Sequence, residues 1–170
     1  IHIAAGAGDN AGAALGLGAS LGDLVISLGT SGTAFAISKS STHDSSGEVA
    51  GFADATGNFL PLACTLNAAK IFNTVAKSLS LSFEEFSSLA LSAKVGAEGL
   101  RIIPHFDGER TPNKPSAKGS FHGITHSNFT KENIARASIE GVIAGMIYAA
   151  RAVERRMCAY ERAPHEQARE

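Results

Sequence analysis

The sequence predicts an α/β domain in which helices pack against a central mixed sheet. Short apolar runs separated by glycine-containing turns occupy the first third of the chain, and such runs are typical of strands. Two segments with helical signals follow, and a long periodic segment begins at Thr130. At 170 residues the chain is long enough to bury one core, so we expect a single domain.

The strands are expected in the first third of the chain. The strand-like runs are residues 1–5, 24–28, 33–38, 48–53 and 58–62. Residues 24–28 and 33–38 flank a glycine turn at residues 29–32, which predicts a hairpin with this turn at its tip. The last two runs flank Thr56 and Gly57, so they predict an antiparallel extension of the sheet.

Three shorter helices are expected before the long one. An alanine- and glycine-rich helix is predicted over residues 11–18. The next helix takes its core face from residues at helical spacing, which are Leu66, Ala69, Phe72, Val75 and Leu79. Ser82 and Glu85 form a capping-box pattern at the start of the third, where Leu81 and Phe86 are spaced for a hydrophobic staple.

The segment after Thr130 is the most regular helix prediction. Its apolar residues at helical spacing are Ile139, Val142, Ile143, Met146, Ile147, Ala150 and Val153. Glycine costs a helix about 1 kcal/mol relative to alanine, so we expect close helix-to-sheet packing at Gly141 and Gly145. The polar residues 161–170 predict a disordered tail, which leaves residues 1–160 as the domain.

The composition argues against several classes of function. Apolar residues make up 44% and charged residues 18%, and the net charge is −1, so bulk charge favours neither a nucleic-acid nor a membrane partner. No apolar run has the length of a membrane span and no leader opens the chain, so we expect a cytoplasmic protein. Cys64 and Cys158 lack ligand-spaced neighbours, which predicts reduced thiols and no dedicated metal site.

Two segments carry the chemistry of phosphoryl transfer. Asp9 lies near the predicted start of a helix, so its carboxylate is placed either to cap that helix or to take a proton from a substrate hydroxyl. The turn at residues 29–32 offers backbone N–H groups and two hydroxyls for phosphate binding, without the lysine of a Walker loop. A base and a phosphate cradle are informative together, because phosphoryl transfer depends mainly on positioning and electrostatics.

A third charged segment, residues 107–112, follows a predicted strand at residues 100–103. It contains Glu109 and Arg110 next to turn-forming glycine and proline residues. The simplest interpretation is structural, with the two side chains paired so that they lock the loop.

In this order the segments resemble the FGGY family of carbohydrate kinases. The matching stretches are residues 5–11, 27–32, 104–112 and 135–142, and the resemblance covers about residues 1–153. It implies an actin-like ATPase, ribonuclease-H-like fold, and specifically the second of the two domains of such a kinase. The branch that phosphorylates D-xylulose is the most similar.

The resemblance also implies roles for individual residues. Asp9 would be the catalytic base, and Asp9 and Asn10 would contact the sugar. The residues implied at the β- and γ-phosphates of ATP are Gly29, Thr30, Ser31 and Gly32. Mg²⁺ would bridge those phosphates and be held partly through water. Glu109 and Arg110 would lie near the cleft between the two domains.

The implied reaction is ATP-dependent phosphorylation of a ketopentose, with D-xylulose to D-xylulose 5-phosphate favoured and ribulose, glycerol and gluconate as alternative substrates. The N-terminal kinase domain and the adenosine-binding segment of the family are not found in this sequence, so we expect the chain alone to be inactive. A non-catalytic actin-like domain that acts as an assembly partner is the alternative from another class. Homodimer formation stays open.

Overall fold

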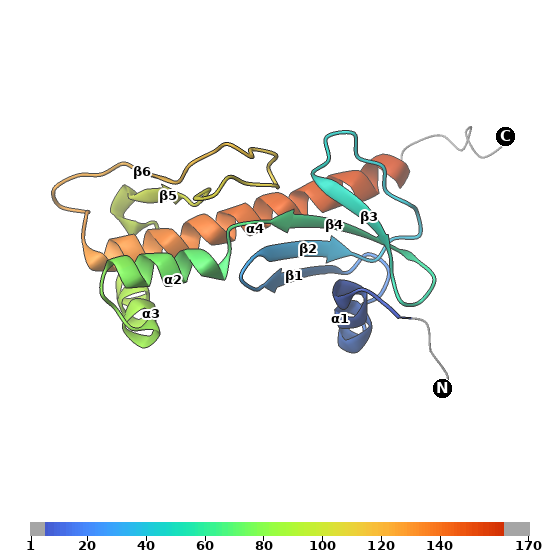
Figure 1. Ribbon diagram of the computed structural model, residues 1–170, viewed down its shortest axis with the longest axis horizontal. Coiled ribbons are helices and arrows are strands. Elements are labelled where there is room, and N and C mark those ends of the chain that lie inside the picture. The colour runs from blue at the N-terminus through green and yellow to red at the C-terminus, as the bar shows by residue number, and fades with distance from the viewer. Residues whose placement is uncertain (1–5, 162–170) are drawn as a thin grey trace.

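The computed structural model describes the backbone of residues 6–161 and the side chains of residues 6–157. A four-stranded sheet lies at one end, two helices and a two-stranded sheet lie at the other, and the long helix α4 (Lys131–Glu161) runs along both (Figure 1). This arrangement confirms the predicted α/β class. The strand expected at residues 1–5 and most of the tail expected at residues 161–170 lie outside the described residues.

The four-stranded sheet has the order β1-β2-β4-β3, and each neighbouring pair is antiparallel. Its strands are β1 (Leu24–Leu28), β2 (Gly32–Ala36), β3 (Val49–Ala53) and β4 (Phe59–Thr65). β1 and β2 form the predicted hairpin, and β3 and β4 form the predicted antiparallel extension. Parallel pairing among the described residues occurs only in isolated bridges, such as the one between Leu21 and Ile37.

Helices cover both faces of this sheet. The cluster under α1 (Asp9–Leu17) contains Ala11, Ala14, Phe35, Ile37, Leu60 and Leu62. The cluster under α4 contains Ala34, Ala36, Val49, Ala63, Met146, Ala149, Ala150, Ala152 and Val153. Residues of β2 alternate between the two clusters because successive side chains of a strand point to opposite faces.

The start of α1 differs from its prediction. The helix begins at Asp9 rather than at residue 11, and its N-cap is Gly8, which provides no side-chain hydrogen bond. It ends at Leu17, and the C-cap is Gly18, whose φ of 68° is the left-handed conformation that glycine adopts easily. Asp9 is therefore the first helical residue, and its interpretation as the N-cap was wrong.

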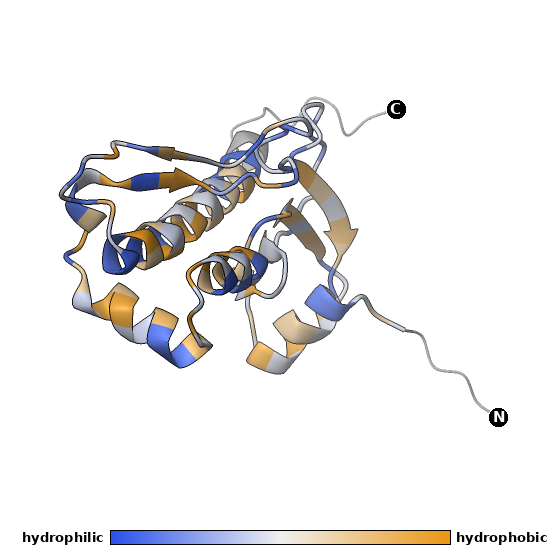
Figure 2. Cartoon of the chain, turned by 60° about the vertical axis from the view of Figure 1, so that its left-hand side comes forward, coloured by the Kyte–Doolittle hydropathy of each residue, from blue (hydrophilic) through white to orange (hydrophobic). Residues whose placement is uncertain are grey.

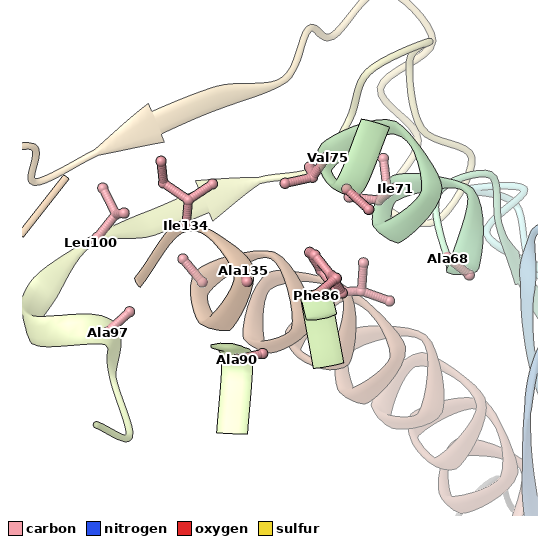
Figure 3. Packing of buried hydrophobic residues seen from close by; sticks show 12 residues of the cluster. Ala68, Ile71, Val75, Phe86, Ala90, Ala97, Leu100, Ile134 and Ala135 are labelled. Carbon is pink, nitrogen blue, oxygen red and sulfur yellow. The ribbon is translucent and has the colours of Figure 1, made fainter. Parts of the chain in front are cut away.

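A third hydrophobic cluster holds the other end of the molecule together. It lies between α2 (Ala69–Ser78), α3 (Phe83–Ser92) and the first half of α4, and its buried residues include Ile71, Val75 and Phe86 (Figure 3). The predicted capping box is confirmed, because Ser82 Oγ accepts from Glu85 N at 3.2 Å and Glu85 Oε2 accepts from Ser82 N at 2.7 Å.

The core face predicted for α2 was only partly right. Val75 is buried, and Phe72 and Leu79 are half-buried and pack against the core. The other buried residues of the helix are Ile71 and Ala76, which were not predicted, and Leu66 lies before its first turn. The face is set by packing against α3 and α4. Beyond α3 the chain continues through η1 (Ala97–Gly99), β5 (Arg101–Ile103) and β6 (Ser120–His122), of which β5 confirms the strand predicted at residues 100–103.

The glycines of α4 have different surroundings. A Cβ at Gly141 would lie 2.5 Å from Ile102 Cγ2 and 2.8 Å from Ile102 O, so the expected close packing is confirmed there, against β5. A Cβ at Gly145 would meet nothing within 4 Å, so close packing at that position was wrong.

The predicted apolar face of α4 is not buried throughout. Ile143 and Ile147 are 45% and 43% exposed. Apolar and small residues occupy the middle of the helix, and hydrophilic residues gather in its first turn and again toward its C-terminal end (Figure 2). Neither this 31-residue helix nor another helix in the described residues is long and apolar enough to cross a membrane.

Candidate phosphoryl-transfer site

The tip of the β1–β2 hairpin, residues 29–31, is fixed by the start of α2. Gly29 O accepts from Ala69 N at 3.0 Å, and Thr30 O accepts from Lys70 N at 3.4 Å. Gly29 N donates to Ser31 O at 3.0 Å. The carbonyls of Gly29 and Thr30 therefore face the start of α2 and accept from its first N–H groups.

The N–H groups and hydroxyls of this tip are available to a ligand. Within the described residues, the backbone N–H groups and the hydroxyls of Thr30 and Ser31 have no hydrogen-bond partner. Both residues are exposed. Successive N–H groups and hydroxyls at an exposed turn form a suitable site for phosphate oxygens.

Gly32 lies below the tip as the first residue of β2, and it is buried. A Cβ at this position would overlap Met146 Sδ and would lie 2.7 Å from Thr65 Oγ1. Glycine is required here because the strand approaches α4 too closely for a side chain.

Asp9 and Asn10 connect α1 to the hairpin. The exposed Asp9 carboxylate accepts from Asn10 N at 2.8 Å and from Asn10 Nδ2 at 3.2 Å. Asn10 Oδ1 in turn accepts from Thr33 Oγ1 at 3.2 Å. One hydrogen-bonded chain thus joins the predicted base to the strand that begins at the phosphate-binding turn.

The loop of residues 107–112 packs against the junction between β4 and α2. Glu109 is only 3% exposed, and its Oε1 accepts from Leu66 N at 2.6 Å and from Arg110 N at 2.8 Å. Its Oε2 accepts from Asn67 Nδ2 at 2.9 Å. Asp107 forms an ion pair with Lys70 at 3.4 Å. This loop therefore lies behind the α2 residues that hold the hairpin tip.

The predicted pairing of the Glu109 and Arg110 side chains was wrong. Arg110 is exposed, and its guanidinium forms no ion pair within the described residues. The Glu109 carboxylate instead binds backbone N–H groups and the Asn67 amide, which are close enough to satisfy it inside the fold.

Two residues of this region had no signal in the sequence. Asn67 is buried and links the loop to the start of α2. Glu48 holds the far end of the loop, because its backbone O accepts from Thr111 Oγ1 and its Oε1 from Asn113 N, each at 3.0 Å. Both make contacts with residues more than forty positions away, which local patterns do not reveal.

Cys64, in β4, is not a nucleophile in this setting. Burial raises the pKa of its thiol, and the negative charge of Glu109 raises that pKa further while Arg110 opposes the shift. The thiol therefore stays protonated at neutral pH. Cys64 is a free cysteine, as predicted, and the side chain of Cys158 lies outside the described residues.

The fold is that of an actin-like ATPase domain. Residues 24–166 match the FGGY family of carbohydrate kinases, C-terminal domain, and the chain belongs to this family. The match begins at β1, after Asp9, and extends past the segment in which the resemblance was predicted to end.

Relatives with known names support the same assignment. The chain is 45% identical over 145 residues to the xylulose kinase of Streptomyces coelicolor, which covers 85% of this chain and 28% of that protein. It is 37% identical over 141 residues to the xylulose kinase of Haemophilus influenzae, with 82% of this chain and 29% of that protein covered. The chain thus spans less than a third of the length of these relatives.

Solved structures agree in fold. The crystal structure of xylulose kinase from Bifidobacterium adolescentis superposes with a TM-score of 0.83 and 48% identity, covering 89% of this chain and 30% of that one. Glycerol kinase from Plasmodium falciparum, with ADP, gives a TM-score of 0.77 at 15% identity and covers 88% of this chain and 31% of that one. The second likeness is one of fold alone.

Proposed function

We propose that the polypeptide containing this chain phosphorylates a ketopentose with ATP, converting D-xylulose to D-xylulose 5-phosphate. The observation that carries the proposal is the hydrogen-bonded chain from Asp9 through Asn10 to Thr33, next to a turn with available N–H groups and hydroxyls. The similarity to xylulose kinases at 45% and 37% identity supports the choice of sugar.

In the proposed reaction the Asp9 carboxylate accepts a proton from the sugar hydroxyl. The hydroxyl oxygen forms a bond to the γ-phosphorus while the bond to the β,γ-bridging oxygen breaks, and ADP leaves with that electron pair. Asn10 orients the carboxylate through its two hydrogen bonds to Oδ1. Asn10 and Asp9 both face the sugar in this proposal.

The phosphates are assigned to the hairpin tip. Thr30 and Ser31 donate backbone N–H groups and hydroxyls to the β- and γ-phosphates. Gly29 and Gly32 flank these two residues, and Gly32 lets β2 pack closely against Met146 and Thr65 below the tip. Donors that are fixed before the reaction stabilise the charge that develops on the transferred group.

The donor set fits Mg²⁺ carried by the nucleotide. The described residues contain no group of three or more His, Cys, Asp or Glu side chains placed to hold a metal ion, and Asp9 provides one exposed carboxylate. Mg²⁺ usually keeps several waters and binds through phosphates and one or two carboxylates. When bound, it would neutralise charge on the phosphates.

The proposal requires parts of the polypeptide beyond this chain. An N-terminal kinase domain would close over the sugar and exclude water. The enzyme would act in the cytoplasm. We therefore propose that the 170-residue chain alone is inactive. Arg110, exposed at the end of the loop, would lie at the cleft between the domains.

The test measures ATP-dependent phosphorylation of D-xylulose, D-ribulose, glycerol and gluconate by the full-length polypeptide and by this chain. We expect activity in the full-length form alone, with D-xylulose the best substrate by kcat/KM. A preference for gluconate would replace D-xylulose with gluconate as the proposed substrate. Gluconate is included because a gluconate kinase from Lactobacillus acidophilus is similar to this chain, with a TM-score of 0.68 and 29% identity. A folded full-length protein that is silent toward all four would favour the non-catalytic assembly role.

A further inference from the structure

Glu109 is a buried carboxylate whose partners are all neutral. It is 3% exposed, it has no ion pair among the described residues, and three N–H groups of Leu66, Asn67 and Arg110 donate to it. A buried carboxylate is costly unless its hydrogen bonds are satisfied, so these bonds fix its position tightly. Two of the three donors belong to the residues just before α2.

The same short segment holds the phosphate-binding turn. Leu66 N is bound by Glu109, and three residues later Ala69 N donates to Gly29 O at 3.0 Å. Ala68 between them is fully buried, which leaves this segment little room to move. Glu109 therefore fixes the start of α2, and the start of α2 fixes the carbonyls of the hairpin tip, within about one helical turn of chain.

Asn67 has one acceptable orientation in this arrangement. Its Nδ2 donates to Gly108 O at 2.7 Å and to Glu109 Oε2 at 2.9 Å. Turning the amide over would place Oδ1 against two acceptors. Oδ1 itself is buried and has no donor within the described residues. The contact between Asn67 and Glu109 therefore depends on an amide facing a carboxylate.

We infer that Glu109, acting with Asn67, is a positioning residue for the phosphate-binding turn. This inference rests on the proposed function. Glu109 does not touch ATP. It holds the start of α2, and α2 holds Gly29 and Thr30 so that the N–H groups of the tip face the phosphates. Loss of this support moves the turn and weakens the binding of phosphates while sugar binding is kept.

Exchange of the two functional groups provides a specific test. Glu109→Gln places an amide against the Asn67 amide, and Asn67→Asp places a carboxylate against Glu109. In the double variant the amide introduced at position 109 again donates to a carboxylate, now at position 67, although the hydrogen bond to Gly108 O is lost. The restored hydrogen bond between positions 109 and 67 should therefore recover part of the lost ATP binding.

The matched control is Glu48→Gln. The Glu48 side chain binds the other end of the same loop by accepting from Asn113 N, and it does not contact the start of α2. Glu48→Gln therefore makes the same exchange of a carboxylate for an amide in the same loop, but away from the residues that hold the turn. Asn67→Ala is a milder variant for the case that Glu109→Gln fails to fold, because it leaves two of the three Glu109 hydrogen bonds in place.

The measurements use the full-length enzyme: kcat, KM for ATP and for D-xylulose, and the affinities for ADP and a non-hydrolysable ATP analogue. We expect each single exchange to raise KM for ATP and weaken the analogue roughly 10-fold or more, since small displacements in a site have effects of this size. The KM for the sugar should change less than twofold. The double variant should recover at least threefold, Asn67→Ala should shift KM for ATP in the same direction, and Glu48→Gln should resemble the wild type.

Unchanged ATP parameters in Asn67→Ala and in a folded Glu109→Gln would overturn the inference. So would equal losses in Glu48→Gln, or a double variant no better than the worse single variant. A wild-type enzyme that binds nucleotide but phosphorylates none of the sugars would contradict the proposed function only, because the nucleotide affinities of the variants would still decide the role of Glu109.

Discussion

Thr33 donates its hydroxyl to Asn10 Oδ1 at 3.2 Å, which joins the strand after the phosphate-binding turn to the start of α1. Thr33→Val keeps the size and β-branching of the side chain and removes this hydrogen bond. We expect kcat of the full-length enzyme to fall roughly 10-fold, because Asn10 loses the contact that orients it toward Asp9. Thr74→Val is a control, since the Thr74 hydroxyl binds only a carbonyl within α2. Equal losses in both variants would count against the connection.

Asp9→Asn tests the base directly. The variant keeps the shape of the side chain and loses the proton acceptor, so kcat with D-xylulose should fall by roughly 10²–10⁴ while sugar binding persists. Steady-state kinetics and calorimetric sugar binding measure the two effects separately. Asp23→Asn alters another exposed aspartate, which accepts from Ser20 N, and it should keep near-normal turnover. Near-normal turnover in Asp9→Asn would remove Asp9 from the mechanism.

Gly141 and Gly145 form a matched pair for stability. Gly141→Ala places a Cβ against Ile102, including its backbone O, and should destabilise the fold by about 1–3 kcal/mol. Gly145→Ala meets nothing within 4 Å and should stabilise the helix by up to about 1 kcal/mol. Urea unfolding of the two variants gives the difference. Effects of the same sign would show that the surroundings of the two glycines are alike.

Asp44 predicts a dependence of stability on pH. Burial alone would raise the pKa of its carboxyl, but hydrogen bonds from Ser46 and Val49 and the charge of Arg156 outweigh it and hold the pKa below its usual range. A lowered folded-state pKa contributes stability that is complete above the unfolded value of about 3.9 and is lost as pH falls through the folded-state pKa.

We therefore expect Asp44→Asn to be less stable than the wild type at pH 7 by about 1–3 kcal/mol, and the gap to narrow below about pH 4. Urea unfolding across a pH series measures it. A gap that stays constant from about pH 7 to about pH 3 would mean that the ionised carboxylate is not responsible.

Local signals in the sequence predicted much of the fold. The hairpin was predicted because a glycine turn separates two apolar runs, and the capping box because Ser82 and Glu85 have a fixed spacing. These features depend on residues close together in the chain. The helix of Asp9 was misjudged by two residues because glycine served as the N-cap where a side-chain cap had been considered.

The support behind the site could not be predicted in the same way. The Glu109 side chain was expected to pair with the Arg110 side chain, whereas Arg110 contributes only its backbone N–H. The other two partners, Leu66 and Asn67, are more than forty residues away. Exposure of Ile143 and Ile147 likewise depends on which elements lie beside α4, and periodicity alone cannot tell which of its apolar positions are covered. Contacts between segments that are distant in the sequence therefore account for most of the differences between the predicted and the observed structure.

The long helix α4 belongs to two hydrophobic clusters at once, with Val142 in the cluster of α2 and α3 and Met146 in that of the sheet. About one helical turn separates these two side chains. If α4 separates from one cluster, the buried residues of the other cluster become exposed as well. The two ends of the molecule should therefore unfold in a single cooperative transition. A protease that cuts α4 near Gly145 should abolish the whole transition, because no independently stable half would remain.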